Sequence, residues 1–536
     1  MNTRQYDVAV IGGGHNGLTA AAYLARAGLS VVLLEKNPVV GGAALTEEFA
    51  PGFRNSVASY TVSLLNPKVI EELNLKQFGL EIIERPAGNF WPIDDETGVL
   101  LPYDTQRRIA TIAALSEKDA KAYRHYAAAL ECSAAVLRDF VNRTPPNAGG
   151  GILDLVKGGA IGRRVLGLSI AEQRQLLELF TASASDFLGR WFENDFIKAS
   201  FAYDGVVGAY ASPQHPGTAY VLLHHCFGEV NGKTGVWGHA IGGMGAITQA
   251  MAKCAIARGA EIRTDAGVAR VAIEEGRTAG VTLTSGETVR ARSIAANVGA
   301  KLLFRDLVAP GDVADEARAP FLATKTGSGT FRMNVALSEL PDFTCRPGTR
   351  QQEHHEAGII IAPSLGYLEQ AYSDARTFGW SKQPIIEMLI PSTIDATLAP
   401  IGRHVASLFV QHVAPRLPDG RSWENVAERE AFADLVIETI TTYAPNFKAS
   451  VLHRQLLSPL DLERRFGLVD GDIFHGQLSL GQLFSARPVL GHANYRLPVK
   501  GLYLCGSSAH PGGGVTGSPG RNAAREIARD FKLRRN

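Results

Sequence analysis

The first 35 residues alternate between apolar and mixed stretches in the order expected for a strand, a turn, a helix and a second strand. Residues 7–11 are apolar and rich in β-branched side chains, residues 18–27 are rich in Ala and Leu, and a second apolar run ends at Glu35. The hydrophobic period therefore changes from that of a buried strand to that of a helix and back again. We predict a β-α-β unit at this end of the chain.

A glycine motif occupies the first turn of this unit. It reads Gly12-x-Gly14-x-x-Gly17, and Glu35 follows about 20 residues later, at the end of the second strand. Gly12 allows the tight turn, Gly14 lets the backbone approach a pyrophosphate, and Gly17 lets helix and strand pack closely. The Glu35 carboxylate can accept hydrogen bonds from both ribose hydroxyls and disfavours a 2′-phosphate. We therefore predict FAD or NAD binding; the alternative is a β-α-β unit that binds no ligand.

A second pair of glycines, Gly41 and Gly42, follows Glu35 closely. It suits a long cofactor whose diphosphate and ribityl chain continue past the first turn, whereas a nicotinamide cofactor has no evident use for it. This pair favours FAD over NAD. The alternative is an ordinary surface turn.

The C-terminal run "GLYLCGSSAHPGGGVTGSPGRNAA" covers residues 501–524. It combines an apolar strand, a turn crowded with glycines and a helix-forming stretch. Glycine lets the backbone come close to a ligand, and the start of a helix presents unpaired N–H groups. We expect the strand to join the nucleotide-domain sheet, so that both ends of the chain meet at one site.

Two internal segments are ambiguous. Residues 144–169 mix glycines and apolar residues with Lys157, Arg163 and Arg164. The apolar residues do not fall on one clean helical face, which favours a cap or loop of a substrate domain, with a membrane-surface segment as the alternative.

Residues 237–265 imitate a second dinucleotide fold, but no β-branched strand precedes the glycines and Thr248 occupies the third glycine position. We expect no separate NAD(P) domain, although the helix start at residues 242–245 could face a ligand.

Composition narrows the class of protein. The 536 residues are 45% hydrophobic, with 54 basic and 53 acidic residues, which is typical of a globular chain of two or more domains and gives no sign of nucleic-acid binding. No apolar run is long enough for a transmembrane helix. The five cysteines form no C-x-x-C, so we expect no zinc or other metal site and no dithiol pair. The cytoplasm, or peripheral contact with a membrane, is the expected location.

Segments with nucleotide-domain character are separated by long insertions. We predict an α/β fold in which a Rossmann-type FAD-binding domain is built from discontinuous segments and an α+β substrate-binding domain is interleaved with it. The predicted FAD-binding segments are residues 1–105, 236–305 and 480–536. The substrate domain comprises residues 106–235 and 306–479.

Several motifs resemble a known family. The N-terminal glycine motif, "VVGG", "GGMGAITQAMA", the "VARV" strand and the C-terminal run resemble the phytoene desaturase-like branch of the FAD-dependent amine oxidase fold. The segments "LLHHCFGEVNGKTGVWGHAIGGMGAI" and "LERRFGLVDGDIFHGQLSLGQLFSARP" look most like the group named pyridine nucleotide-disulphide oxidoreductase domain-containing protein 2. The resemblance covers nearly the whole chain.

The resemblance implies where FAD would bind. Gly12, Gly14, Gly17 and Glu35 would hold the ADP half, with Gly41 and Gly42 beside the diphosphate and ribityl chain. The backbone of Val268 would face the adenine. The C-terminal turn would contact the diphosphate, the ribityl chain and the flavin pyrimidine edge through Gly506 and residues 512–516, which include Gly513, Gly514, Val515 and Thr516. One position departs from the family, because Ala43 stands where relatives often carry Arg.

The chemistry implied is hydride exchange with flavin N5, aided by the partial positive charge of a helix starting near Val515. We expect the substrate to be apolar and isoprenoid- or lipid-like, and to be dehydrogenated, saturated or isomerised. The electron acceptor and the oligomeric state stay open. The alternatives are an amine oxidase that releases hydrogen peroxide and a non-catalytic protein stabilised by FAD.

Four histidines are candidates for proton transfer, namely His225, His239, His475 and His510. We select His510 and His239 as candidate catalytic residues; the alternative for His510 is that it braces the C-terminal turn. Tyr60 and Trp237 could line the substrate cavity or belong to the core.

Overall fold

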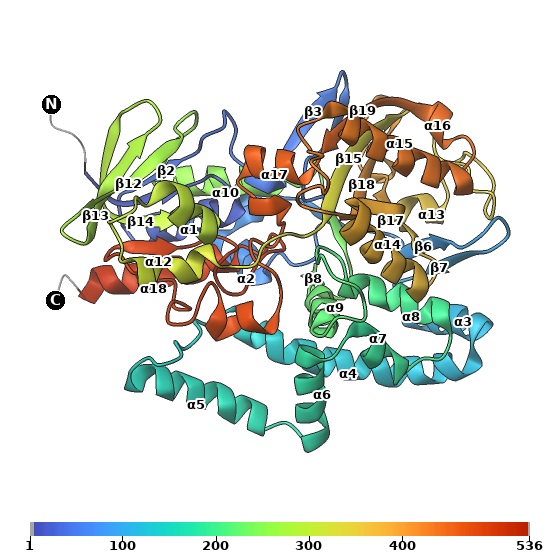
Figure 1. The fold of residues 1–536 in the computed structure, drawn as a ribbon, viewed down its shortest axis with the longest axis horizontal. Coiled ribbons are helices and arrows are strands. Elements are labelled where there is room, and N and C mark those ends of the chain that lie inside the picture. The colour runs from blue at the N-terminus through green and yellow to red at the C-terminus, as the bar shows by residue number, and fades with distance from the viewer. Residues whose placement is uncertain (1–4, 534–536) are drawn as a thin grey trace.

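The computed structural model describes residues 5–533. Figure 1 shows two lobes side by side, with a layer of helices beneath them. Each lobe contains a seven-stranded sheet. Within the described residues, no helix is both long enough and apolar enough to cross a membrane.

The sheet of the first lobe contains both the first and the last strand of the described chain. Its strand order is β11-β2-β1-β14-β13-β12, and β20 pairs with β14. The pairs β11·β2, β2·β1, β1·β14 and β14·β20 are parallel, whereas β12, β13 and β14 form an antiparallel meander. The strands are β1 (Tyr6–Ile11), β2 (Val31–Leu34), β11 (Glu261–Arg263), β12 (Val268–Glu274), β13 (Arg277–Leu283), β14 (Thr288–Ala296) and β20 (Leu502–Leu504).

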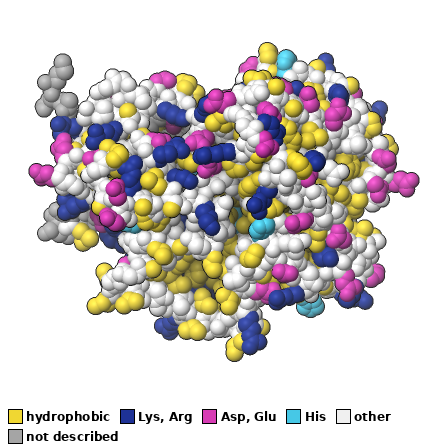
Figure 2. Space-filling view, viewed as in Figure 1, with side chains coloured by type: hydrophobic (Ala, Val, Ile, Leu, Met, Phe, Trp, Pro, Cys, Tyr) yellow, Lys and Arg dark blue, Asp and Glu magenta, His cyan; other side chains and the backbone are white. Residues whose placement is uncertain are grey.

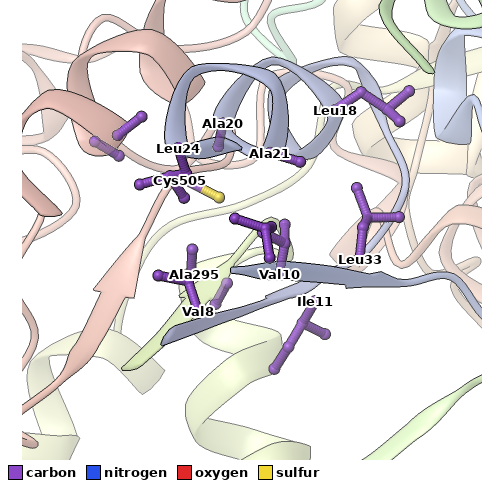
Figure 3. Close-up of a cluster of buried hydrophobic side chains, with 14 of the residues drawn as sticks. Val8, Val10, Ile11, Leu18, Ala20, Ala21, Leu24, Leu33, Ala295 and Cys505 are labelled. Carbon is purple, nitrogen blue, oxygen red and sulfur yellow. The ribbon is translucent and has the colours of Figure 1, made fainter. Parts of the chain in front are cut away.

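Three helices pack on this parallel sheet. Helix α1 (His15–Arg26) contacts both α10 (Gly245–Ala257) and α18 (Ser518–Leu533). Apolar side chains of β1 and α1 form one buried cluster with Cys505, which follows β20 directly (Figure 3). A parallel sheet buried on both faces needs nearly continuous apolar strands, and all four residues of β2 are indeed buried.

The sheet of the second lobe has the order β19-β15-β18-β17-β16-β6-β7. Helix α15 (Val426–Tyr443) contributes side chains to one of its cores, and α14 (Leu365–Phe378) contributes to another. The strands are β6 (Asn89–Pro92), β7 (Gly98–Leu101), β15 (Thr330–Leu337), β16 (Gly358–Ile361), β17 (Trp380–Leu389), β18 (His404–Val413) and β19 (Val451–Leu457).

The helical layer comes from the middle of the chain. Its helices are α3 (Thr105–Leu115), α4 (Glu117–Val141), α6 (Ile170–Thr181), α7 (Ala184–Gly189), α8 (Asp195–Ala202) and α9 (Thr218–Cys226). They share an aromatic core that includes Tyr126, Phe187 and Phe192. Helix α5 (Ile152–Leu166) extends away from this layer along the lower edge of the molecule (Figure 1). The sequence had favoured a cap or loop here.

Short elements connect these layers. They are α2 (Pro67–Leu73), α11 (Ala300–Leu302), α12 (Asp315–Leu322), α13 (Glu353–Glu356), α16 (Phe447–Ser450), α17 (Pro459–Phe466), β3 (Thr46–Ala50), β4 (Phe53–Ser56), β5 (Ile82–Glu84), β8 (Glu229–Val230), β9 (Lys233–Thr234) and β10 (Gly238–Ala240).

Sheet membership places two domain boundaries differently from the prediction. The hairpin of β6 and β7 lies within predicted segment 1–105, yet Asn89 and Phe90 pair with Gly358 and Ile359 of β16 in the second sheet. The sequence of a short hairpin does not indicate which sheet the hairpin joins. The core of the first lobe also continues past residue 305, because Phe321 of α12 packs in it.

Candidate active site

The N-terminal glycine motif and the C-terminal turn meet at the carboxyl edge of the first sheet. Asn16 Nδ2 donates a hydrogen bond of 3.1 Å to Ser507 Oγ, although 491 residues separate them. Helix α18 approaches α1 so closely that a Cβ atom on Gly520 would lie 2.1 Å from the carbonyl oxygen of Asn16. This contact places the C-terminal turn beside the N-terminal glycine motif.

A cavity opens where β1, β2 and β14 end, and we call it the nucleotide cavity. Ligands of open α/β sheets bind in this position, outside the carboxyl ends of the parallel strands. Five residues predicted to bind the cofactor line it, namely Gly12, Gly14, Glu35, Gly42 and Val268. Lys36, Asn37 and Asn297 also line it and were not predicted.

The glycines of the motif have different physical roles. Gly12 has a φ of +96°, a conformation that favours glycine. A Cβ atom on Gly17 would lie 2.1 Å from the carbonyl oxygen of Gly12, so α1 can rest on the turn only with glycine there. At Gly14 the only atom near such a Cβ is Asn297 Nδ2, at 3.1 Å. The backbone of Gly14 therefore faces the open cavity.

Glu35 is held at the rim of the nucleotide cavity by hydrogen bonds to both carboxylate oxygens. Oε2 accepts from the backbone N–H of Gly13 at 2.6 Å, and Oε1 accepts from the backbone N–H and the side-chain amide of Asn37 at 2.9 and 2.8 Å. Each carboxylate oxygen has two lone pairs, and the pair of oxygens can still accept from a ligand hydroxyl.

The second glycine pair packs on the first turn. The backbone N–H of Gly41, which has a φ of +146°, donates to the carbonyl oxygen of Gly13 at 2.9 Å. A Cβ atom on Gly42 would approach Gly14 Cα to 3.2 Å. These contacts extend the glycine wall of the cavity toward Ala43.

A second space, which we call the inner cavity, adjoins the nucleotide cavity. Both cavities are lined by His15, Ala43, Leu468, His475 and Ser507, so the two spaces meet at these residues. The other walls of the inner cavity come from both lobes and from the helical layer: Ala58, Ser59, Tyr60, Thr61, Ser63, Leu64, Val207, His225, Trp237, Phe409, Ile473, Phe474, Gly514 and Val515.

The C-terminal turn contributes to the inner cavity, but its helix starts later than expected. Gly514 and Val515 line this cavity, with positive φ values of 101° and 56°. Such backbone cannot belong to a right-handed helix, and α18 begins at Ser518 rather than near Val515. Elsewhere in the turn, a Cβ atom on Gly513 would lie 2.9 Å from Phe474.

The other predicted C-terminal residues lie beside the cavities. A Cβ atom on Gly506 would lie 3.0 Å from Asn297, so this glycine permits close packing of β20 on β14. Thr516 lines a third cavity, next to the inner one. Gly17, Gly41, Gly506 and Gly513 thus shape the walls through packing.

The helix start near residue 242 is capped internally. The backbone N–H groups of Met244 and Gly245 donate to Ser56 Oγ at 2.9 Å and to Thr46 Oγ1 at 2.8 Å. These N–H groups are engaged with the protein, and β11, which follows α10, joins the first sheet beside β2.

The two histidines selected as candidate catalytic residues are held by internal partners outside the inner cavity. His239 Nε2 lies 2.8 Å from Asp395 Oδ2. His510 Nε2 lies 3.0 Å from the carbonyl oxygen of Phe140, and burial lowers the pKa of His510 to about 4. This geometry favours a bracing role for His510.

Two other histidines stand where the cavities join. Burial lowers the pKa of His15 to about 3, with a further contribution from His475, whose own pKa is lowered to about 4 by burial and by Arg487. His15 Nε2 is buried and has no partner among the described residues. The sequence carries a signal for His15, which directly follows Gly14 in the motif.

A buried polar cluster lies behind one wall of the inner cavity. The hydroxyls of Tyr60 and Tyr203 both donate to Glu387 Oε2, the latter at 2.8 Å. The guanidinium of Arg332 lies 4.4 Å from the centre of the Tyr60 ring. Burial, and then the nearby Glu387, raise the pKa of Asp204 to about 7. Glu387 could have been suspected as the lone acid in the apolar run "PIIEMLI".

The inner cavity itself is apolar and aromatic. Among residues 5–533, none of those lining it is Asp, Glu, Lys or Arg. His225 and Trp237 stack in parallel, with ring centres 6.4 Å apart. Burial lowers the pKa of His225, so its ring is neutral at pH 7. The cavity therefore offers neutral surface to a ligand.

Comparison with known families finds two family models that match this chain. Residues 10–73 match the NAD(P)-binding Rossmann-like domain family, and residues 137–328 match the flavin containing amine oxidoreductase family. The chain is 41% identical to pyridine nucleotide-disulfide oxidoreductase domain-containing protein 2 of Rattus norvegicus, over 98% of this chain and 94% of the relative.

More distant relatives share the full length. A limonene dehydrogenase component of Castellaniella defragrans is 26% identical, over 99% of this chain and 96% of the relative. Phytoene desaturase (lycopene-forming) of Pantoea ananas is 24% identical, over 95% and 96%. A solved structure of putrescine oxidase has a TM-score of 0.61 at 16% identity and covers 99% of both chains, which shows the shared fold.

The cavities fit the cofactor of this family. The open backbone of Gly14, the acceptor oxygens of Glu35 and the unpartnered Nε2 of His15 lie along a continuous space that runs from the first sheet into the inner cavity. The chain belongs to the family of pyridine nucleotide-disulfide oxidoreductase domain-containing protein 2 within the amine oxidase fold, and it is an FAD-dependent oxidoreductase.

Proposed function

We propose that the protein dehydrogenates, saturates or isomerises an apolar, isoprenoid- or lipid-like substrate by hydride exchange with flavin N5. One observation carries this proposal: among the described residues, those that line the inner cavity are apolar, aromatic or neutral polar and include no carboxylate, ammonium or guanidinium. An apolar molecule gains free energy on entering such a cavity, at about 25 cal/mol per Å² of buried surface.

A charged substrate is poorly matched to these walls. Moving an ammonium group into an apolar site costs several kcal/mol unless it is paired. A carboxylate close to the cavity, that of Glu387, lies behind Tyr60 and already accepts hydrogen bonds from Tyr60 and Tyr203. An amine would have to displace these partners to reach it.

The residues of the chain bind the cofactor, orient the substrate and shield both from water. Gly12, Gly14 and Glu35 would hold the ADP half of FAD, and Gly42 would lie near its diphosphate. When bound, FAD supplies a flavin whose N5 exchanges hydride with the substrate. Phe409, on a strand of the second sheet, and the other buried apolar walls exclude water and position the substrate.

Two relatives support an isoprenoid or lipid-like substrate. Their names specify limonene and phytoene, both isoprenoid hydrocarbons, and they match this chain over nearly its full length. Amine oxidation with release of peroxide is the alternative, and a non-catalytic role for bound FAD is a second one.

Anaerobic mixing of the FAD-loaded protein with polyene hydrocarbons, lipids or amines tests the proposal. We expect bleaching of the visible flavin absorbance with an apolar substrate. Bleaching by amines alone would favour the oxidase, and a flavin that dithionite reduces but no organic substrate bleaches would favour the non-catalytic role.

A matched pair of variants locates the effect in the inner cavity. Val207→Arg places a charge among its apolar walls, whereas Ile401→Arg places the same charge on a fully exposed turn. We expect Val207→Arg alone to abolish bleaching by an apolar substrate. FAD content, measured in both variants, checks that the protein is still folded and loaded.

A further inference from the structure

Helix α5 exposes an unusually apolar surface. Ile152, Leu153, Leu155, Val156 and Leu166 are between 65% and 79% exposed. Within α5, which the structure describes completely, no residue is buried. Figure 2 shows hydrophobic side chains gathered at the lower edge of the molecule, where Figure 1 places this helix. A cluster of large exposed apolar side chains on one element indicates a surface that binds a membrane or another molecule.

The exposed apolar residues share one side of α5. At 100° per residue, Ile152, Leu155, Val156 and Leu166 fall within an arc of about 100°, and including Leu153 widens this arc to about 160°. The other large apolar residues of the helix, such as Ile161, lie on the opposite side and are half-buried. The sequence suggested no clean face because both sides of the helix carry apolar residues.

The charge on α5 is complementary to an anionic surface. Its one acid, Asp154, faces Lys157 at 3.5 Å in an ion pair. Arg163 and Arg164 are exposed, and neither forms an ion pair with a described residue. The helix therefore presents two uncompensated positive charges beside its apolar side chains, the combination found in helices that lie in the interface of anionic membranes.

Helix α5 closely follows, along the chain, the rim of a cavity that leads into the protein. A third cavity, which we call the entrance cavity, has a volume of about 330 Å³ and is lined in part by Arg138, Val141 and Asn142 at the end of α4. Residues 143–151 lead directly from this rim to α5. Leu64 lines both the entrance cavity and the inner cavity.

We propose that α5 lies in the surface of an anionic lipid bilayer and that the entrance cavity receives the substrate from that bilayer. The first part stands on the exposed surface and charge of α5 alone. The second part rests on the proposed function, because it assumes a substrate that dissolves in lipid.

Vesicle co-sedimentation of the FAD-loaded protein tests the first part. We expect binding to vesicles of equimolar phosphatidylcholine and phosphatidylglycerol, weaker binding to phosphatidylcholine alone, and loss of binding as salt is raised. The double variant Arg163→Glu/Arg164→Glu should bind at least about tenfold more weakly, since each basic residue contributes about 1 kcal/mol, or roughly fivefold, near an anionic surface. The double variant Ile152→Asp/Val156→Asp should also bind at least about tenfold more weakly, because it replaces two apolar side chains that would enter the bilayer surface with carboxylates.

A control variant separates this surface from exposed apolar residues in general. Ile401→Asp removes a fully exposed apolar side chain in the turn before β18 and should bind vesicles as the unaltered protein does. Unchanged FAD content and melting temperature in all variants would show that they fold. Undiminished vesicle binding by Ile152→Asp/Val156→Asp, or no binding by the unaltered protein, would overturn the proposal. A dimer that this variant dissociates, without any vesicle binding, would assign α5 to a second copy of the chain instead.

The source of the substrate is tested separately from its identity. With an apolar substrate that bleaches the flavin, Arg163→Glu/Arg164→Glu should slow bleaching by vesicle-embedded substrate while leaving bleaching by detergent-solubilised substrate unchanged. Equal slowing in both media would refute entry from the bilayer, and so would the absence of slowing in either medium. Vesicle binding without bleaching by any apolar compound would refute the proposed function and leave the role of α5 standing.

Discussion

Replacing Gly17 by alanine tests the packing that shapes the nucleotide cavity. The added Cβ atom would lie 2.1 Å from the carbonyl oxygen of Gly12 and 2.8 Å from Asn297 Nδ2. Real Cβ atoms do not come nearer than about 3 Å to such neighbours, so α1 must move by about 1 Å away from the turn. The obstructing oxygen belongs to the backbone and cannot rotate aside.

Two opposing effects set the magnitude. Alanine in place of glycine within a helix gains about 1 kcal/mol in propensity. Forcing extra volume into a packed contact costs about 1–3 kcal/mol and occasionally more, and this rigid contact belongs at the upper end. We expect a net loss of about 2 kcal/mol, a fall in melting temperature of about 4–8 °C for a lobe of this size, and reduced FAD content.

Thermal unfolding and the ratio of flavin absorbance to protein absorbance provide the assay. Gly159→Ala is the control, because Gly159 also lies within a helix but has no atom within 4 Å of an added Cβ. It should stabilise slightly or have no effect. If Gly17→Ala matches Gly159→Ala in melting temperature and FAD content, close packing at this glycine does not hold the site together.

Further predictions concern groups around the two cavities. Glu35→Ala should lower FAD affinity by tenfold or more in equilibrium dialysis, since it removes a charged acceptor worth about 1.5–3 kcal/mol; full FAD occupancy would refute its role. Burial raises the pKa of Asp395, but hydrogen bonds from His239, Thr397 and the Gly242 backbone outweigh this and lower it from 3.8 to about 2. The carboxylate therefore stabilises the fold above about pH 4, and this contribution is lost as the pH falls toward 2; Asp395→Asn should flatten the dependence of melting temperature on pH in that window. Arg487→Met should cost about 3 kcal/mol in urea unfolding, because the buried guanidinium donates to the carbonyl oxygens of Phe474, Ser507 and Gly476. A loss below about 1 kcal/mol would mean that water replaces these bonds.

The N-terminal unit was predictable because its signals are local. The strand, the glycine turn with Gly12 and Gly14, the helix and Glu35 follow one another within a single β-α-β unit, and all of them lie where the motif places them. The return of the C-terminal strand to the same sheet was also predicted, because a buried parallel strand reads as a short apolar run.

The remaining features depend on distant partners that a single sequence does not reveal. The side chain of Glu387 lies in an apolar strand, and only the fold shows that Tyr60 and Tyr203 approach it from other elements. His475 reaches the junction of the cavities through tertiary packing. The start of α18 was predicted too early because the positive φ of Val515, which is uncommon for a β-branched residue, has no local signature.

The closure of the first sheet by β20 also determines when the protein can acquire its cofactor during synthesis. Residues 294–296 of β14 hydrogen-bond to β1 on one side and to β20 on the other. A ribosome releases the β-α-β unit long before residues 502–504, so the β20 side of β14 stays open while hundreds of residues are made. Such an unpaired edge favours association with other chains. We therefore expect flavin loading to belong to the last stage of folding, and a chain interrupted before its final strand to be both colourless and prone to aggregate.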